Sequence, residues 1–313
     1  MTMVRRWGLV VGVSVAALVI ALPIAFQPVL RADIAEETTF LLLVLWAPML
    51  TGGIIAWAVV GGFGDRDRLD QRVRQALDGH PLTRELTWLG VFLCCFVLLM
   101  VLLSRLFQIY GAHTGADLNM SASLVSRLLF LFTLPILVMD RSGITVDGKG
   151  TAMPAVALKV NTPWRWLGLI PAAAVLVLAG YAIVPNLGLP PLSLGLIGFV
   201  LAFALIAMCE EIFYRAMLQT RLEVLMGRWG GIVATTLIFS LAYAFVQPFD
   251  EVSQLPDAGY GHLFALSLLS YGPAGLLYGY LWTCFRNIWT NVTIRIGMFI
   301  VLMPPDLEFG ILA

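Results

Sequence analysis

About nine long apolar runs constrain the fold of this 313-residue chain more than any other feature of its sequence. Each run is close to the roughly 20 residues with which an α-helix crosses the hydrocarbon core of a bilayer. Because backbone groups find no water there, a spanning segment satisfies them internally by forming a helix. We therefore predict an all-α, polytopic helical membrane protein with about eight or nine transmembrane helices. The runs cover residues 8–28, 39–62, 87–109, 123–139, 167–185, 192–211, 230–248, 262–283 and 288–303.

The charge composition agrees with this fold class. Charged residues make up only 12% of the chain, against roughly 25% in soluble domains, which excludes an ordinary soluble protein. An apolar fraction of 60% also excludes a disordered chain. Lys+Arg and Asp+Glu both number 19, whereas a nucleic-acid-binding protein would show a basic excess. The sequence therefore predicts the lipid bilayer as a partner and no nucleic acid.

The placement of the basic residues predicts the orientation of the chain. If the N-terminus is cytoplasmic, 15 of the 19 Lys and Arg residues fall in loops on that side, and only Arg31 falls in an outer loop. Because positive loops face the cytoplasm, we predict a multi-pass integral protein with a cytoplasmic N-terminus, in a bacterial inner or plasma membrane. The first run follows Arg5 and Arg6 as in a signal peptide. It is long for one and lacks an Ala-x-Ala site, which favours a retained helix.

Polar connections divide the chain into two predicted membrane regions. Between 63 and 86, three apolar residues recur at helical spacing (Leu69, Val73 and Leu77), which predicts a short amphipathic surface helix. A long polar connection with Gly and Pro separates the first four runs from the last five. The predicted organisation is a four-helix membrane region at 1–140 with a cytoplasmic loop at 63–86, a cytoplasmic connection at 141–166, a helical membrane domain at 167–303 and a short tail at 304–313.

Three arginines lie inside apolar runs. Arg105 and Arg127 each stand about one turn from an outer helix end, so snorkelling of the side chain to the interface accounts for both. Arg295 lies seven residues into the last run, at a depth of about 10 Å. A charge at such depth is expected to be paired or functional.

Cysteine and histidine placement gives no sign of a metal or cofactor. The cysteines lie in or beside apolar runs without a CxxC pair, and we interpret them as small buried hydrophobic residues. The histidines are scattered, those outside the last half stand in loops where solvation is expected, and no HExxH occurs. We therefore expect no metal site and no cofactor. The residues concerned are Cys94, Cys95, Cys209 and Cys284, and His80, His113 and His262.

Two adjacent carboxylates, Glu210 and Glu211, end an apolar run and form the unusual local feature of the chain. Glu211 precedes Arg215 by four residues, the favourable order for a helical ion pair. Glu210 points about 100° away from Glu211 around the helix, and its neighbour one turn on is Tyr214. Glu210 is then the free acid or base, since a carboxyl group in an apolar pocket can shuttle a proton. The alternative is a charge cluster that marks the end of a membrane helix.

The pattern Glu-Glu-x-x-x-Arg at a membrane helix end resembles the CAAX-protease and bacteriocin-processing family of intramembrane glutamic endopeptidases. The family's next motif, Phe-x-x-x-His, aligns with Phe239 to Tyr243. Its last motif, His-x-x-x-Asn, aligns with Arg295 to Phe299, in a run that Ile288-Trp289 opens. The resemblance covers roughly residues 165–303.

The resemblance implies that the first glutamate and the Phe-x-x-x-His histidine activate water, and that the last motif steadies the oxyanion. Here Tyr243 and Arg295 replace the two histidines, and Phe299 replaces the asparagine. Tyrosine, with a reference pKa near 10, is a poor base at neutral pH, and arginine keeps its proton. The candidate catalytic residues are Glu210, Glu211, Arg215, Tyr243 and Arg295, with Tyr214, Phe239 and Asn291 in support.

The charges of this candidate site suggest a second interpretation. Two glutamates and two arginines sum to zero, and a balanced buried quartet is a plausible structural solution. We predict that Arg295 pairs with Glu210 and takes the place of the catalytic water. Asn287 and Asn291 share a helical face with Arg295. We interpret the two asparagines as marking the helix end, although they could also donate to a substrate carbonyl.

Three functions therefore remain open at the level of sequence. The first is hydrolysis of membrane-proximal peptide bonds by glutamate-activated water, and the missing histidines weigh against it. The second is a catalytically silent family member that acts as a membrane binding or scaffold protein, with a membrane protein or peptide as partner. The third is a transporter or ion relay that uses the intramembrane charges.

Overall fold

The computed structural model describes residues 2–64, 66–114, 119–138, 157–246 and 260–303. Within these ranges the chain is helical, and no strand occurs among them, which confirms the all-α prediction. The helices of the first half are α1 (Thr2–Phe26), α2 (Pro28–Phe40), η1 (Leu41–Trp46), α3 (Ala47–Phe63), α4 (Arg66–Ala76), α5 (Leu82–Thr114), α6 (Asn119–Arg127), η2 (Leu128–Thr133) and α7 (Leu134–Ile136). Those of the second half are η4 (Pro163–Gly168), α9 (Leu169–Leu187), α10 (Leu194–Glu211), η5 (Ile212–Gln219), α11 (Thr220–Met226), α12 (Arg228–Tyr243), α13 (Tyr260–Phe285) and α14 (Ile288–Leu302).

Five of the described helical stretches are long and apolar enough to cross a membrane. Two shorter apolar helices, Ser123–Ile136 and Ile288–Leu302, accompany them. The protein is therefore an integral membrane protein of helices, whereas the count of eight or nine spans remains a prediction. The five stretches are Trp7–Phe26, Thr38–Phe63, Leu82–Leu103, Pro163–Pro185 and Leu194–Met226.

The fifth stretch corrects one part of the sequence interpretation. The apolar run at 192–211 was expected to end in a cytoplasmic loop that holds Arg215 and Arg221. Instead the helix continues from α10 through η5 and α11 to Met226, and both arginines are fully buried. Both arginines have carboxylate partners inside the protein. Glu211, one turn earlier in the same continuous helix, lies 3.5 Å from Arg215, and Glu85 on α5 lies 2.5 Å from Arg221.

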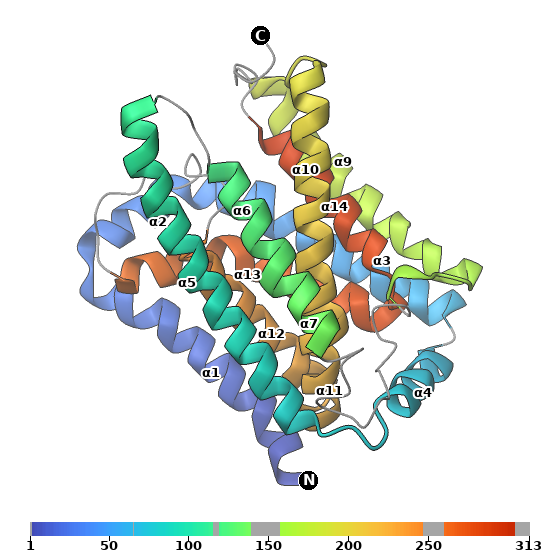
Figure 1. Cartoon of the computed structure of the whole chain (residues 1–313). Helices are drawn as coiled ribbons and strands as arrows, with labels where there is room; N and C mark the ends of the chain where they lie inside the picture. Colours follow the sequence, from blue (N-terminus) through green and yellow to red (C-terminus); the bar gives the residue numbers. More distant parts are fainter. Residues whose placement is uncertain (1, 65, 115–118, 139–156, 247–259, 304–313) are drawn as a thin grey trace.

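The helices pack so that α10 and η5 lie between the two halves of the chain. Helices α5 and α6 lie side by side, α6 also packs against α10, and α14 packs against α10 as well (Figure 1). The first helix packs on α12 and α13, and α3 packs on α9. Residues from both halves therefore meet around the end of α10.

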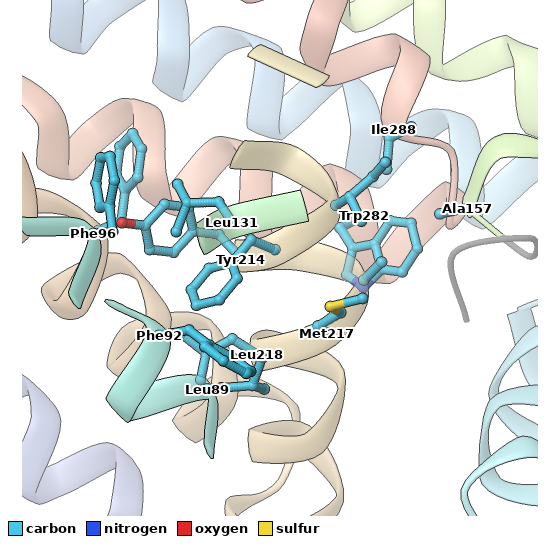
Figure 2. Close-up of a cluster of buried hydrophobic side chains, with 14 of the residues drawn as sticks. Leu89, Phe92, Phe96, Leu131, Ala157, Tyr214, Met217, Leu218, Trp282 and Ile288 are labelled. Carbon is cyan, nitrogen blue, oxygen red and sulfur yellow. The ribbon is translucent and has the colours of Figure 1, made fainter. Parts of the chain in front are cut away.

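The largest hydrophobic cluster surrounds this meeting point. Figure 2 shows side chains from α5, η2, η5 and α13 in one cluster, among them Phe96, Leu131, Tyr214 and Trp282. Because apolar burial is the main stabilising term in packing, this cluster holds the first half of the chain against the second.

The amphipathic helix predicted between 63 and 86 is present as α4. Leu69, Val73 and Leu77 are buried, whereas Arg72 and Arg74 are exposed. Since α4 joins the ends of α3 and α5, it lies at one end of the helix bundle (Figure 1). That this end faces the cytoplasm remains a prediction.

Candidate functional site

Glu210 and Glu211 are the last two residues of α10, and neither is exposed. A π-helical segment, η5, follows directly. Such segments are rare and frequently occur at functional sites. The carboxylates therefore lie inside the protein at a local change of helical geometry, rather than at a solvated helix end.

Both oxygens of the Glu210 carboxylate accept hydrogen bonds from charged or hydroxyl donors. Oε1 accepts from Nε of Arg127. Oε2 accepts from the hydroxyl of Tyr243 and from Nη2 of Arg295. Glu210 has no cation within one turn of its own helix, as the sequence indicated, but guanidiniums from α6 and α14 reach it.

The Glu211 carboxylate has its own donors. Oε1 accepts from Nη1 of Arg295 at 3.2 Å, and Oε2 accepts from Nδ2 of Asn291 at 2.8 Å. Arg215 Nε lies 3.5 Å from Oε2, which is the i,i+4 pair expected from the sequence. The Arg215 guanidinium also lies over the ring of Phe239, at 5.4 Å from Cζ to the centroid. Such cation–π contacts stabilise a cation away from water.

Arg295 joins the two glutamates. Its Nη2 donates to Glu210 and its Nη1 to Glu211, so the predicted pairing of Arg295 with Glu210 is present in the structure. Nη2 also lies 2.5 Å from the hydroxyl of Tyr243. An arginine fork suits such bridging because its five N–H donors are held in one plane.

Arg127 is the residue that the sequence interpretation missed. It was expected to snorkel to the interface, but it is fully buried and bonded to Glu210. Its Nη1 donates to the carbonyl of Ser123 at 3.2 Å and its Nη2 to the carbonyl of Val246 at 3.1 Å. Its Cζ lies 5.1 Å from the centroid of the Phe96 ring. Because α6 packs on α10, the Arg127 side chain reaches a carboxylate in the protein interior and does not extend to the membrane surface.

Asn291 also departs from its expected place. It was interpreted as a marker of the helix end, yet it is buried and donates to Glu211 and to the carbonyl of Tyr278. Asn287 does mark the end: its Oδ1 accepts from the backbone N–H of Trp289 and thereby caps α14. The two asparagines lie one turn apart but serve different partners.

The remaining candidate residues lie in an aromatic group beside the carboxylates. Phe239 and Tyr243 stand one turn apart on α12, with ring centroids separated by 4.6 Å. Tyr214 packs edge-on against Phe239 at 5.3 Å, and its buried hydroxyl has no hydrogen-bond partner among the described residues. Tyr214 therefore contributes packing to the site and no hydrogen bond to Glu210. Phe299, at the position of the family's asparagine, stacks on Phe203 at 4.2 Å.

The net charge of the cluster is one unit more positive than the sequence predicted. The expected quartet of two glutamates and two arginines was neutral. With Arg127, the described cluster holds three guanidiniums against two ionised carboxylates. Each carboxylate is shared between two cations, which compensates part of the large desolvation penalty for burying five charges.

Other chemistry-bearing residues lie apart from this cluster. Within the described parts of the chain, no group of three or more His, Cys, Asp or Glu residues could hold a metal ion. Cys209 and Cys284 are buried as expected, whereas Cys94 is exposed. Cys94 is exposed because it lies on the outward-facing side of α5. His80 is not simply solvated in a loop, because its Nδ1 lies 2.9 Å from Oε1 of the buried Glu85.

Comparison with known protein families finds a match in the second half of the chain. The family model described as "Type II CAAX prenyl endopeptidase Rce1-like" matches residues 191–300. The second half of the chain is therefore similar to the Rce1-like family over this segment. The matched segment contains the glutamate pair, Tyr243 and Arg295, and it excludes Arg127. No curated protein and no solved structure matches the chain. The Rce1-like segment therefore receives one cation of its glutamate cluster from outside the family match.

Proposed function

We propose that this protein is a catalytically silent Rce1-like membrane protein, in which the glutamate cluster holds the two halves of the chain together. The observation that carries this proposal is the occupation of Glu210: Arg127, Tyr243 and Arg295 donate to its two oxygens. A general base needs an oxygen within hydrogen-bond reach of the water it deprotonates. In this arrangement the donors that surround Glu210 are side chains of the protein itself.

The two residues at the positions of the family's histidines, Tyr243 and Arg295, also offer no second base. The tyrosine hydroxyl is protonated near neutral pH, and the guanidinium does not lose its proton. Both groups stabilise the ionised form of the carboxylate and so oppose its protonation by a substrate water. This chemistry favours a structural ion-pair centre over hydrolysis.

A silent relative would act as a binding or scaffold protein in the membrane. The partner would be a membrane protein or a membrane-proximal peptide, in keeping with the prenylated peptide substrates that the family's name specifies. Photo-crosslinking from residues of α12 and α14 in native membranes would identify such a partner. A cross-linked product that depends on the family-matched segment is the expected outcome.

A cleavage assay tests directly whether the protein lacks peptidase activity. Purified protein in lipid vesicles is incubated with prenylated and unprenylated Cys-a-a-X peptides and with a general peptide library. We expect that any hydrolysis by the unmodified protein will be equal in the Glu210→Gln variant, so that none of it depends on Glu210. A matched variant, Tyr243→His with Arg295→His, restores the two histidines of the family motif and keeps Glu210. Glu210-dependent cleavage by the unmodified protein would overturn the proposal.

Hydrolysis with altered helper residues is the second candidate. One observation favours it: Tyr243 and Arg295 place a hydroxyl and a guanidinium 2.5 Å apart beside Glu210, and both groups can stabilise an oxyanion. The same assay decides between the two functions. An ion relay through the buried charges is a third hypothesis, which a flux measurement in the same vesicles addresses.

A further inference from the structure

A second group of charged residues lies at the end of the bundle that carries α4. Arg286, in the turn between α13 and α14, is 2% exposed. Its Nη2 donates to Oε2 of Glu223 at 2.6 Å and lies 3.5 Å from Oδ1 of Asp70 on α4. Asp70 binds Arg228 more closely, at 2.6 Å. Arg286 therefore has one close carboxylate partner and one at the limit of an ion pair.

The backbone of Arg286 is held in an uncommon conformation. Its φ of 47° lies in the left-handed region, which residues with a side chain rarely adopt. Arg165 supports this conformation: its Nε donates to the carbonyl of Phe285 at 2.8 Å, and its Nη2 donates to the carbonyl of Arg286. Strain of this kind tends to occur at functional sites, where the surrounding structure maintains it.

The Arg286 guanidinium also has donors to spare. Nε and Nη1 are buried and have no hydrogen-bond partner within the part of the chain that the structure describes. Trp282 lies beneath the guanidinium, at 5.4 Å from Cζ to the ring centroid. Buried donors of a charged group are costly when left unpaired. These N–H groups therefore keep hydrogen-bonding capacity that an anionic acceptor would use.

The surroundings point to a ligand at the membrane surface. Arg72 is exposed on α4, two residues after Asp70, whose Oδ1 lies 3.5 Å from Nη2 of Arg286. Three tryptophans, two in η4 and one in the first turn of α14, lie at this end of the bundle, as is common at the headgroup level of a bilayer. They are Trp164, Trp166 and Trp289. A cationic group at headgroup level suits the phosphate of a lipid.

We propose that Arg286 and Arg72 bind the phosphate of an anionic phospholipid headgroup at the membrane surface that carries α4. The phosphate oxygens accept from the spare N–H groups of Arg286 and replace the long contact of that guanidinium with Asp70. Arg72 forms the exposed side of the site. Arg165 holds the backbone that presents Arg286 and is not itself a ligand. This site does not depend on whether the Glu210 cluster is catalytic.

The test measures lipid retention by the full chain. The protein is purified in detergent, stripped of lipid, and titrated with phosphatidylglycerol or phosphatidylcholine, and bound lipid is counted by native mass spectrometry. We expect preferential binding of phosphatidylglycerol, weakened about five-fold in Arg72→Gln. Arg74→Gln, an exposed arginine on the same helix, is the matched control and should bind as the unmodified protein does.

Arg286→Gln should lose more affinity than Arg72→Gln, and its melting curve in detergent verifies that it is folded. If it does not fold, Arg72→Gln alone decides, since that side chain is exposed. Competition with inorganic phosphate separates the two sources of phosphate: at equal phosphate concentration we expect the lipid to win. Equal binding of both lipids, equal competition by free phosphate, or an Arg72→Gln affinity equal to that of Arg74→Gln would each overturn the proposal.

Discussion

Arg127 on α6 and Glu210 at the end of α10 lie 83 residues apart in the chain and form a fully buried ion pair. Glu210 belongs to the segment that matches the Rce1-like family, and Arg127 does not. The pair therefore connects the first half of the chain to the second, and Arg127 adds a third guanidinium to a group of charges that is balanced within the second half. Removing Glu210 leaves Arg127 buried without its carboxylate, whereas removing Arg127 leaves Glu210 paired with Arg295.

Glu210→Leu should destabilise the protein more than Arg127→Met. The first variant leaves three buried guanidiniums with one carboxylate, whereas the second leaves two guanidiniums with two carboxylates. Breaking a buried pair costs about 3–5 kcal/mol, so both variants should unfold at lower temperature in detergent. Arg105→Met, on an exposed position of α5, is the control and should melt as the unmodified protein does. A reversed order of the two variants would contradict the excess of positive charge in the cluster.

The double variant Arg127→Met with Glu210→Leu should be more stable than Glu210→Leu alone. It removes one cation together with the carboxylate that bound it, and paired apolar replacements of buried ion pairs are often well tolerated. A double-mutant cycle on melting temperature or chemical unfolding measures the coupling. Strict additivity of the two single effects would argue that the pair contributes nothing as a pair.

Tyr243→Phe should destabilise the protein, and Tyr214→Phe should not. The Tyr243 hydroxyl donates to Glu210 and lies 2.5 Å from Nη2 of Arg295, so its loss leaves two charged groups short of a partner. We expect a loss of about 1–3 kcal/mol. Tyr214 provides a matched control, because it packs on the same Phe239 ring and its buried hydroxyl has no hydrogen-bond partner among the described residues. Equal effects of the two substitutions on thermal unfolding would show that ring packing, and not the hydroxyl, matters at position 243.

Asn291→Leu should cost more stability than Asn287→Ala. The leucine leaves Oε2 of Glu211 and the carbonyl of Tyr278 without their shared donor inside the protein. Asn287 caps α14, and loss of a cap costs about 1 kcal/mol. We expect about 1–3 kcal/mol for the buried position. Chemical unfolding of both variants in the same detergent compares them, and a larger effect at Asn287 would be evidence against the glutamate contact.

Glu85→Gln should loosen the contact between α5 and α11. Glu85 is fully buried and binds Nε of Arg221 at 2.5 Å and Nδ1 of His80 at 2.9 Å. A neutral amide leaves the buried Arg221 without its carboxylate, which should cost about 3 kcal/mol or more. Hydrogen exchange of α11 and α5 should rise together in this variant. His80→Gln keeps a polar partner for Glu85 and serves as the milder comparison, and exchange that stays unchanged in Glu85→Gln would contradict the contact.

Several features could be predicted from the sequence because they depend on local spacing. The apolar runs indicated a helical membrane protein, and the i,i+4 spacing of Glu211 and Arg215 indicated their ion pair. The recurrence of Leu69, Val73 and Leu77 indicated the buried face of α4. The depth of Arg295 required a partner, and the adjacent glutamates were the candidates available in the same family pattern.

Other features depended on the way in which helices pack. An arginine one turn from a helix end can reach the interface or the interior, and the neighbouring helix decides which. For Arg127 that neighbour is α10, whose terminal carboxylate lies within reach. The same reason explains why Arg221 is buried in continuous helix, since Glu85 on the neighbouring α5 pairs with it, although its polar character suggested a loop.

The sequence by itself therefore determined the class of protein, the Glu210-Glu211 pair and the cations within one helical turn of it. Only the tertiary structure decided the charge environment of Glu210, because Arg127, Tyr243 and Arg295 come from three other helices. Periodicity along one helix fixes which side chains share a face over a few residues. Contacts between residues far apart in the chain arise when apolar faces pack and bring their few polar groups together in an interior without water to solvate them.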